Sequence, residues 1–150
     1  MDIGASRRTL DELLEEAQAR IERLHPTQAL AAVQQGALMI DIRSDSDRER
    51  EGIVPGSLHI PRTVLEWRVD PDSTWRNPHI GGLDRQVVIL CEHGCSSVFA
   101  AAALVDLGFT RAGDVVGGFA AWRQAGLPTV KAPSHRRGGN ELAGMRPPDH

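Results

Sequence analysis

The stretch that decides the fold is Val87-Val88-Ile89-Leu90-Cys91-Glu92-His93-Gly94-Cys95-Ser96-Ser97, which a run of small residues follows. Residues 87–90 are all valine, isoleucine or leucine, as in a strand that a parallel sheet buries on both faces. Residues 100–107 have the composition of a helix, and Gly108 is typical of a helix end. We therefore expect Cys91 to open a short loop between a buried strand and a helix.

This loop predicts a reactive thiol at Cys91. A loop that enters a helix in this way turns backbone N–H groups and the positive end of the helix dipole towards one point. A cysteine there should have a lowered pKa and should tolerate an anion beside it. Ser96 and Ser97 are of the type that caps a helix N-terminus, and Ser96 is also a candidate donor to a bound oxyanion.

The composition excludes several classes of protein. The chain of 150 residues has a net charge of -3 and no tyrosine, which argues against a nucleic-acid partner. No apolar run is long enough to span a membrane, and residues 1–11 lack the apolar core of a secretory signal. Two closely spaced cysteines fit a reducing cytoplasm better than a disulfide framework. We expect a cytoplasmic protein of one domain.

Residues 1–24 are expected to form an N-terminal helical extension. Thr9-Leu10-Asp11-Glu12 has the pattern of a capping box, with Thr9 as the N-cap residue. The apolar residues that repeat at helical spacing are Leu10, Leu13, Leu14, Ala17, Ile21 and Leu24. Such a stripe lies across the domain or packs against a second copy, so one expectation is a homodimer through this helix. The sequence does not fix the residue at which this helix ends, because residues 24–26 also fit an extended segment.

Residues 25–130 alternate between expected helices and strands. The expected helices are 28–35, 62–68, 100–107 and 119–124, the first capped by Thr27, and the expected strands are 37–42, 58–60, 87–90 and 112–116. The charged residues 45–51 and the turn-rich residues 69–82 are expected to be loops. This order predicts an α/β fold with a small doubly wound parallel sheet flanked by helices. Residues 131–150 are expected to be a disordered tail, because they are rich in Pro, Gly, Arg and His.

Motifs in this region, taken in order, resemble those of the rhodanese family of sulfurtransferases. The motifs are Leu38-Met39-Ile40-Asp41-Ile42-Arg43, the segment 51–57 with His59-Ile60-Pro61, the Cys91 loop, and residues 115–122 with Gly126-Leu127-Pro128. The resemblance implies a rhodanese-like domain over residues 25–130. It also implies an active-site loop, Cys91 to Ser96, whose amides face the sulfur.

The resemblance implies a role for Cys91 as the nucleophile. Its thiolate would attack a sulfane sulfur from thiosulfate or a low-molecular-weight persulfide, hold it as a persulfide, and pass it to a thiol or cyanide. The amides of residues 92–97 would stabilise the thiolate and the terminal sulfur. The alternative is that Cys91 is merely a small buried apolar residue.

The other loop residues leave alternatives open. Cys95 either points outward without a role or is a resolving thiol for Cys91. His93 stabilises the loop or lines its mouth, with proton transfer as the alternative. Glu92 stands in a loop where many rhodaneses carry a cation that holds thiosulfate; facing the pocket, it would repel a dianion and raise the pKa of Cys91. Cys91, His93 and Cys95 lack the second ligand pair of a zinc site, so we expect no metal and no cofactor.

Residues outside the loop are expected to support it. Asp41 and Arg43 follow a buried strand and are interpreted as loop anchors rather than substrate contacts. His59 is expected beneath the pocket. Gly117 and Gly118 should let the backbone pass close to the Cys91 loop.

The leading hypothesis is therefore a sulfurtransferase with small-molecule substrates. The alternatives are a thiol redox or persulfide-sensing module that uses Cys91 and Cys95, and a binding domain without turnover. A cysteine phosphatase or arsenate reductase of the same fold is disfavoured, because Ser97 stands where those loops place an arginine.

Overall fold

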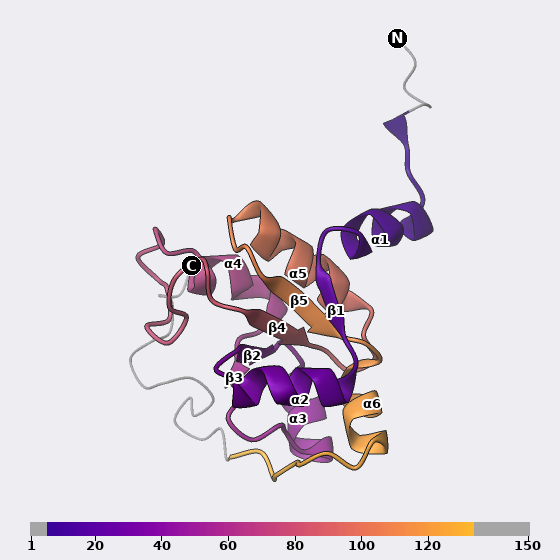
Figure 1. The fold of residues 1–150 in the computed structure, drawn as a ribbon, viewed down its shortest axis with the longest axis vertical. Helices are drawn as coiled ribbons and strands as arrows, with labels where there is room; N and C mark the ends of the chain where they lie inside the picture. The colour runs from indigo at the N-terminus through magenta and orange to yellow at the C-terminus, as the bar shows by residue number, and fades with distance from the viewer. Residues whose placement is uncertain (1–5, 134–150) are drawn as a thin grey trace.

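The computed structural model describes residues 6–133, in which a parallel sheet lies between two layers of helices (Figure 1). The helices are α1 (Leu10–Gln18), α2 (Pro26–Gln34), α3 (Asp45–Glu51), α4 (Leu65–Val69), α5 (Ser96–Asp106) and α6 (Gly118–Gln124), with a 3-10 turn at Arg62–Val64. The strands are β1 (Glu22–Leu24), β2 (Leu38–Asp41), β3 (Leu58–His59), β4 (Val87–Leu90) and β5 (Ala112–Val115).

The sheet has the strand order β1-β5-β4-β2-β3, and every neighbouring pair is parallel. Strand β4 lies in the middle, paired with β2 from Leu38 opposite Val87 to Asp41 opposite Leu90. Because parallel strands end at one edge, the segments after β2, β4 and β5 meet there. Cys91, which directly follows β4, lies at the centre of that edge.

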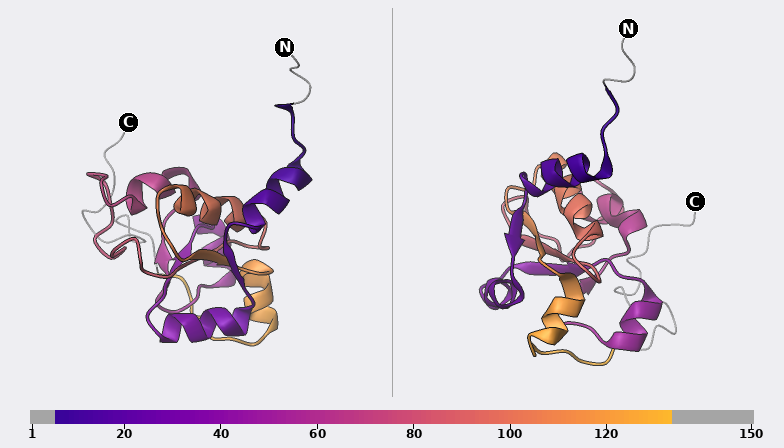
Figure 2. Two further views of the ribbon diagram at one scale, coloured as in Figure 1. Left: turned by 45° about the horizontal axis from the view of Figure 1, so that its top comes forward. Right: turned by 90° about the vertical axis from the view of Figure 1, so that its right-hand side faces the viewer.

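The helices divide between the two faces of the sheet. Helices α1, α4 and α5 cover one face, and α2, α3 and α6 cover the other (Figure 2). Alternate residues of each central strand enter the two cores, so Ile89 packs with Leu104 on one side and Val88 packs with Trp122 on the other. This arrangement confirms the predicted doubly wound fold.

The N-terminal segment is only partly helical, which corrects the expectation that its apolar residues lie along a single helix. Thr9 does form a capping box: Glu12 N donates to Thr9 Oγ1 at 3.1 Å, and Thr9 N donates to Glu12 Oε1 at 2.8 Å. Helix α1 ends at Gln18, however, and residues 22–24 form β1 on the edge of β5. Pairing with β5 and the extended preference of residues before Pro26 outweigh the helical spacing of the apolar residues.

Helices α2 and α3 also differ from the sequence prediction. Helix α2 begins at Pro26, because proline suits a first helical turn and the Gln28 side chain accepts from His25 N at 2.8 Å; Thr27 is not its cap. Residues 45–51 are helix α3 rather than a loop. Ser44 caps that helix, and Asp45 and Asp47 lie in its first turn, where the helix dipole favours negative charge.

The predicted tail, residues 131–150, lies mostly outside the described residues. Just before it, Val130 pairs with Ile53 in an isolated antiparallel bridge. Between residues 6 and 133, no helix has the length and apolarity needed to cross a membrane.

Candidate active site

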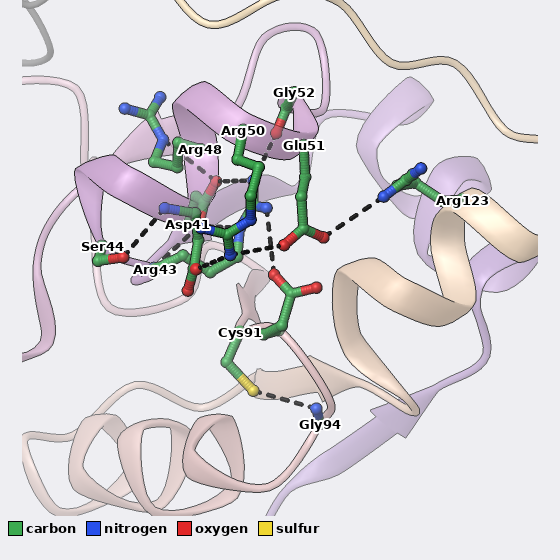
Figure 3. A network of polar contacts seen from close by, with 12 residues as sticks. Asp41, Arg43, Ser44, Arg48, Arg50, Glu51, Gly52, Cys91, Gly94 and Arg123 are labelled. Atoms are coloured by element: carbon green, nitrogen blue, oxygen red, sulfur yellow. Dashed lines mark hydrogen bonds and ion pairs between the residues drawn. The ribbon is translucent and has the colours of Figure 1, made fainter.

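The sulfur of Cys91 lies inside the loop that joins β4 to α5. The amides of Gly94 and Ser97 donate to Sγ at 3.1 and 3.4 Å, and Ser97 Oγ lies 3.2 Å from it (Figure 3 shows the Gly94 contact). Cys91 is only 5% exposed. Two of the expected amides, one just before an 11-residue helix and one in its first turn, therefore converge on one sulfur.

The surroundings of Cys91 change its acidity in two opposite directions. Burial raises the pKa of the thiol, because a charged sulfur is poorly solvated there. Hydrogen bonds with the Ser97 and Ser96 side chains, and from the amides of Ser97 and Gly94, lower it, and together they outweigh burial. The pKa of Cys91 therefore lies below that of an ordinary thiol, as a nucleophilic cysteine requires.

Helix α6 fixes the loop from outside. Phe119 N donates to the Cys91 carbonyl at 2.8 Å, and Ala120 N donates to the Glu92 carbonyl at 3.0 Å. A Cβ atom on Gly118 would lie 2.5 Å from the Cys91 oxygen, and one on Gly94 would lie 2.5 Å from Gly117 N. Gly117 and Gly118 thus lie where the sequence analysis expected them, against the loop backbone.

The two serines do not cap helix α5, which corrects their expected role. Cys95 is the N-cap residue, and α5 begins at Ser96. The Ser97 side chain turns inward instead and donates to Asp114 Oδ2 at 2.7 Å. Its hydroxyl therefore lies between a sulfur and a carboxylate.

Sequence reasoning missed two charged residues at this site, Arg23 in β1 and Asp114 in β5. Arg23 Nε and Nη2 donate to the two Asp114 oxygens at 2.9 and 3.0 Å, and Nη2 also donates to the Gly94 carbonyl at 3.1 Å. A cation absent from the loop sequence thus reaches the loop from another strand. The available signal was Asp114 itself, a carboxylate in an otherwise apolar strand.

Asp41 and Arg43 form a buried anchor beside the loop (Figure 3). Arg43 Nη2 lies 2.9 Å from Asp41 Oδ2 and 2.9 Å from the Gly52 carbonyl, and Arg48 Nε lies 3.3 Å from Asp41 Oδ2. The Arg43 guanidinium also stacks 3.8 Å above the Phe119 ring. These contacts support the interpretation of both residues as anchors.

The Glu92 carboxylate forms an ion pair with Arg43. Its Oε1 lies 3.4 Å from Arg43 Nη1, and burial and the neighbouring Glu51 raise the pKa of Glu92. Since the pKa of Cys91 is lowered, the rise in that pKa considered for Glu92 does not dominate. Glu92 and the exposed His93 line a surface pocket of about 740 Å³ with Glu51 and Arg123.

The described residues contain no group of three or more His, Cys, Asp or Glu side chains arranged to hold a metal ion. Cys91 and Cys95 are both free; Cys95 is exposed on the rim of the loop, whereas Cys91 is buried.

His59 lies buried next to the anchor formed by Asp41 and Arg43. Its Nε2 is 2.8 Å from the Arg43 carbonyl, while Nδ1 has no hydrogen-bond partner among residues 6–133 and lies 3.8 Å from Asp45 Oδ1. Burial, followed by the charge of Arg48, lowers the pKa of His59. The folded protein therefore favours the neutral ring.

The free energy of unfolding should consequently depend on pH through His59. Stability from the neutral ring is complete above the unfolded pKa of about 6.5 and falls as the pH drops below it, because the unfolded state binds the proton first. Urea unfolding at several pH values should show this loss, and His59→Gln should flatten it. Equal slopes for the two proteins would contradict the assignment.

Comparison with known proteins agrees with this geometry. A family model described as a rhodanese-like domain matches residues 25–125. The thiosulfate sulfurtransferase GlpE of Pseudomonas savastanoi pv. phaseolicola is 35% identical over 103 residues, which are 68% of this chain and 87% of that protein. GlpE of Haemophilus influenzae is 30% identical over 108 residues, 71% of this chain and 92% of that protein.

Solved structures share the fold. A protein of unknown function from Rhodopseudomonas palustris, described as a possible tyrosine phosphatase, superposes with a TM-score of 0.75 at 35% identity, covering 82% of this chain and 95% of that one. A polysulfide-sulfur transferase homodimer from Wolinella succinogenes has a TM-score of 0.66 at 22% identity, covering 90% and 97%, and supports the fold alone. The chain belongs to the rhodanese-like family of sulfurtransferases.

Proposed function

We propose that this enzyme carries a sulfane sulfur as a persulfide on Cys91, with thiosulfate or a low-molecular-weight persulfide as donor and a thiol or cyanide as acceptor. The relatives named thiosulfate sulfurtransferase support this donor class. The observation that carries the proposal is the convergence of the Gly94 and Ser97 amides on Sγ. Such donors stabilise negative charge on sulfur and need no rearrangement during the reaction.

With thiosulfate as donor, the reaction has two displacement steps. The Cys91 thiolate attacks the outer sulfur, the S–S bond of thiosulfate breaks, and sulfite leaves with the bonding electron pair. In the second step cyanide or a thiolate attacks the terminal sulfur of the persulfide, and the Cys91 thiolate leaves. The amides at Gly94 and Ser97 favour the anionic sulfur that each step consumes or restores.

Replacing Cys91 provides the direct test. Cys91→Ser should reduce thiocyanate formation from thiosulfate and cyanide by at least about a thousandfold, because the nucleophile is lost. The matched control is Cys95→Ser, the other thiol of the same loop, which should keep most of the activity and should gain the mass of one sulfur atom after thiosulfate treatment. Equal activity of the two variants would end the proposal.

Two alternative functions have distinct readouts. A redox module would lose two hydrogens after mild peroxide, and only when both Cys91 and Cys95 are present. A binding domain would show slow alkylation of Cys91 near neutral pH. The Rhodopseudomonas neighbour is described as a possible phosphatase, but this chain has Ser97 rather than an arginine at the loop end, so we expect no phosphate-ester hydrolysis.

The compartment and the oligomeric state of the protein can be proposed from two further features. A reducing compartment such as the cytoplasm suits a chain with two free thiols. Self-association through α1 is compatible with the exposure of Leu10 and Leu13, which are 63% and 38% exposed. Light scattering of the purified protein measures that association directly.

A further inference from the structure

The hydroxyl of Ser97 has one proton and two neighbours that can accept it. Ser97 Oγ lies 2.7 Å from Asp114 Oδ2 and 3.2 Å from Cys91 Sγ. Ser97 and Asp114 are both 0% exposed, so water does not reach either of them from the surface. The Ser97 proton therefore serves the carboxylate or the sulfur, but not both at full strength.

The hydrogen bonds of the resting thiol form a chain. The Cys91 S–H donates to Ser97 Oγ, and Ser97 donates to Asp114. When Cys91 loses its proton, the S–H donor disappears and the hydroxyl has to turn to Sγ if it is to stabilise the thiolate. Asp114 then loses one bond but keeps the two that Arg23 donates.

We infer that the buried Asp114–Arg23 ion pair is a positioning element for sulfur transfer: Asp114 competes with Cys91 for the Ser97 hydroxyl, and Arg23 allows Asp114 to release it. This inference rests on the proposed role of Cys91 as the nucleophile. It assigns to two residues outside the loop the control of how readily the thiolate forms.

The charges around the loop make the two members of the pair act in opposite directions. Arg23 interacts electrostatically with Cys91 and favours its thiolate, whereas the negative charge of Asp114 opposes it. The other ionisable groups of the loop are Glu92, which is paired with Arg43, and the exposed His93 and Cys95. The first turns of α5 and α6 carry no acidic residue.

This balance has a chemical use. Two amides, a hydroxyl and a helix N-terminus all favour the thiolate, but a thiolate that is stabilised too strongly is a weak nucleophile. Because Asp114 competes for the Ser97 proton, the hydroxyl stabilises the thiolate less than it would alone. The best attacking thiol has a pKa near the ambient pH, and Asp114 would hold Cys91 closer to that point.

The test measures iodoacetamide alkylation of Cys91 against pH in a Cys95→Ser background, so that a single thiol reacts. Asp114→Asn removes the competing charge and should move the midpoint to lower pH by about one unit, so that alkylation below the midpoint is about tenfold faster. Arg23→Gln should move it upward by a similar amount. The pH profile of kcat/KM for thiosulfate should shift with each midpoint.

Ser97→Ala separates the proposed route from a plain charge effect. When it is combined with Ser97→Ala, Asp114→Asn should lose most of its shift, because the hydroxyl that links the two groups is gone. The matched control is Asp106→Asn, which neutralises an exposed carboxylate on α5 that pairs with Arg20, and which should leave the midpoint unchanged.

The inference is overturned if Asp114→Asn and Arg23→Gln shift the midpoint in the same direction, or if the Asp114→Asn shift is equally large in the Ser97→Ala background. Arg23 is partly exposed, with a side chain 26% accessible, so its variant decides the question if Asp114→Asn does not fold; no upward shift would then refute the pair's role. Alkylation needs no sulfur donor, so this result stands even if thiosulfate proves not to be a substrate.

Discussion

Gly118→Ala should reduce sulfur transfer by at least about a hundredfold, because it displaces the Cys91 loop from helix α6. Gly118 has φ +64°, and an added Cβ would lie 2.5 Å from the Cys91 oxygen and 2.7 Å from the Glu92 carbonyl. All the contacted atoms are backbone, so no side chain can move aside. The left-handed conformation and the overlap together should cost about 2–5 kcal/mol of unfolding free energy.

The matched control is Gly126→Ala. Gly126 has a similar φ of +72°, but no atom lies within 4 Å of its added Cβ. It should lose only about 1 kcal/mol, from the backbone conformation, and should keep its activity. Thiosulfate–cyanide kinetics and urea unfolding of both variants measure the difference. Near wild-type turnover in Gly118→Ala would show that the contact of the loop with α6 is not needed.

Asp41→Asn should be the most destabilising change to a polar side chain, at about 3–5 kcal/mol. Asp41 is 0% exposed and accepts from the Arg43 backbone amide, the Arg43 guanidinium and Arg48 Nε. Without the negative charge, two buried guanidinium groups repel each other and lose the carboxylate between them. The stack of Arg43 on Phe119, at the start of α6, should loosen as a result.

Urea unfolding of Asp41→Asn against Asp47→Asn measures this effect. Asp47 makes a pair of the same chemistry with Arg50 on the surface of α3, and its loss should cost at most about 1 kcal/mol. Similar losses for the two variants would show that the buried anchor contributes no more than a surface ion pair.

The central part of the fold was predictable because its signals are local. Strand β4, the Cys91 loop and the start of α5 follow one another without interruption, and their pattern depends only on neighbouring residues. Strand β1 was not predictable in this way, since a three-residue edge strand is defined by its pairing with β5. Helix α3 was misread because its charges suggested a loop, although Ser44 as a cap and Asp45 and Asp47 in the first turn favour a helix.

The residues of the site likewise differ in whether local sequence could predict them. Cys91 and Gly94 could be placed from the loop sequence, because the amide of one lies three residues from the sulfur of the other. The Arg23–Asp114 pair joins residues 91 positions apart, and no spacing rule connects them. The role of Ser97 depended on that pair, so a residue that looked like a helix cap proved to face the sulfur.

The edge strand β1 also bears on the residue at which a functional domain of this protein has to begin. The family model starts at residue 25, just after Arg23. A polypeptide trimmed to that boundary would keep every residue of the Cys91 loop, yet it would lose the guanidinium that donates to both oxygens of Asp114. The shortened protein would still be recognised as a rhodanese-like domain, but Asp114 would have lost that neutralising partner.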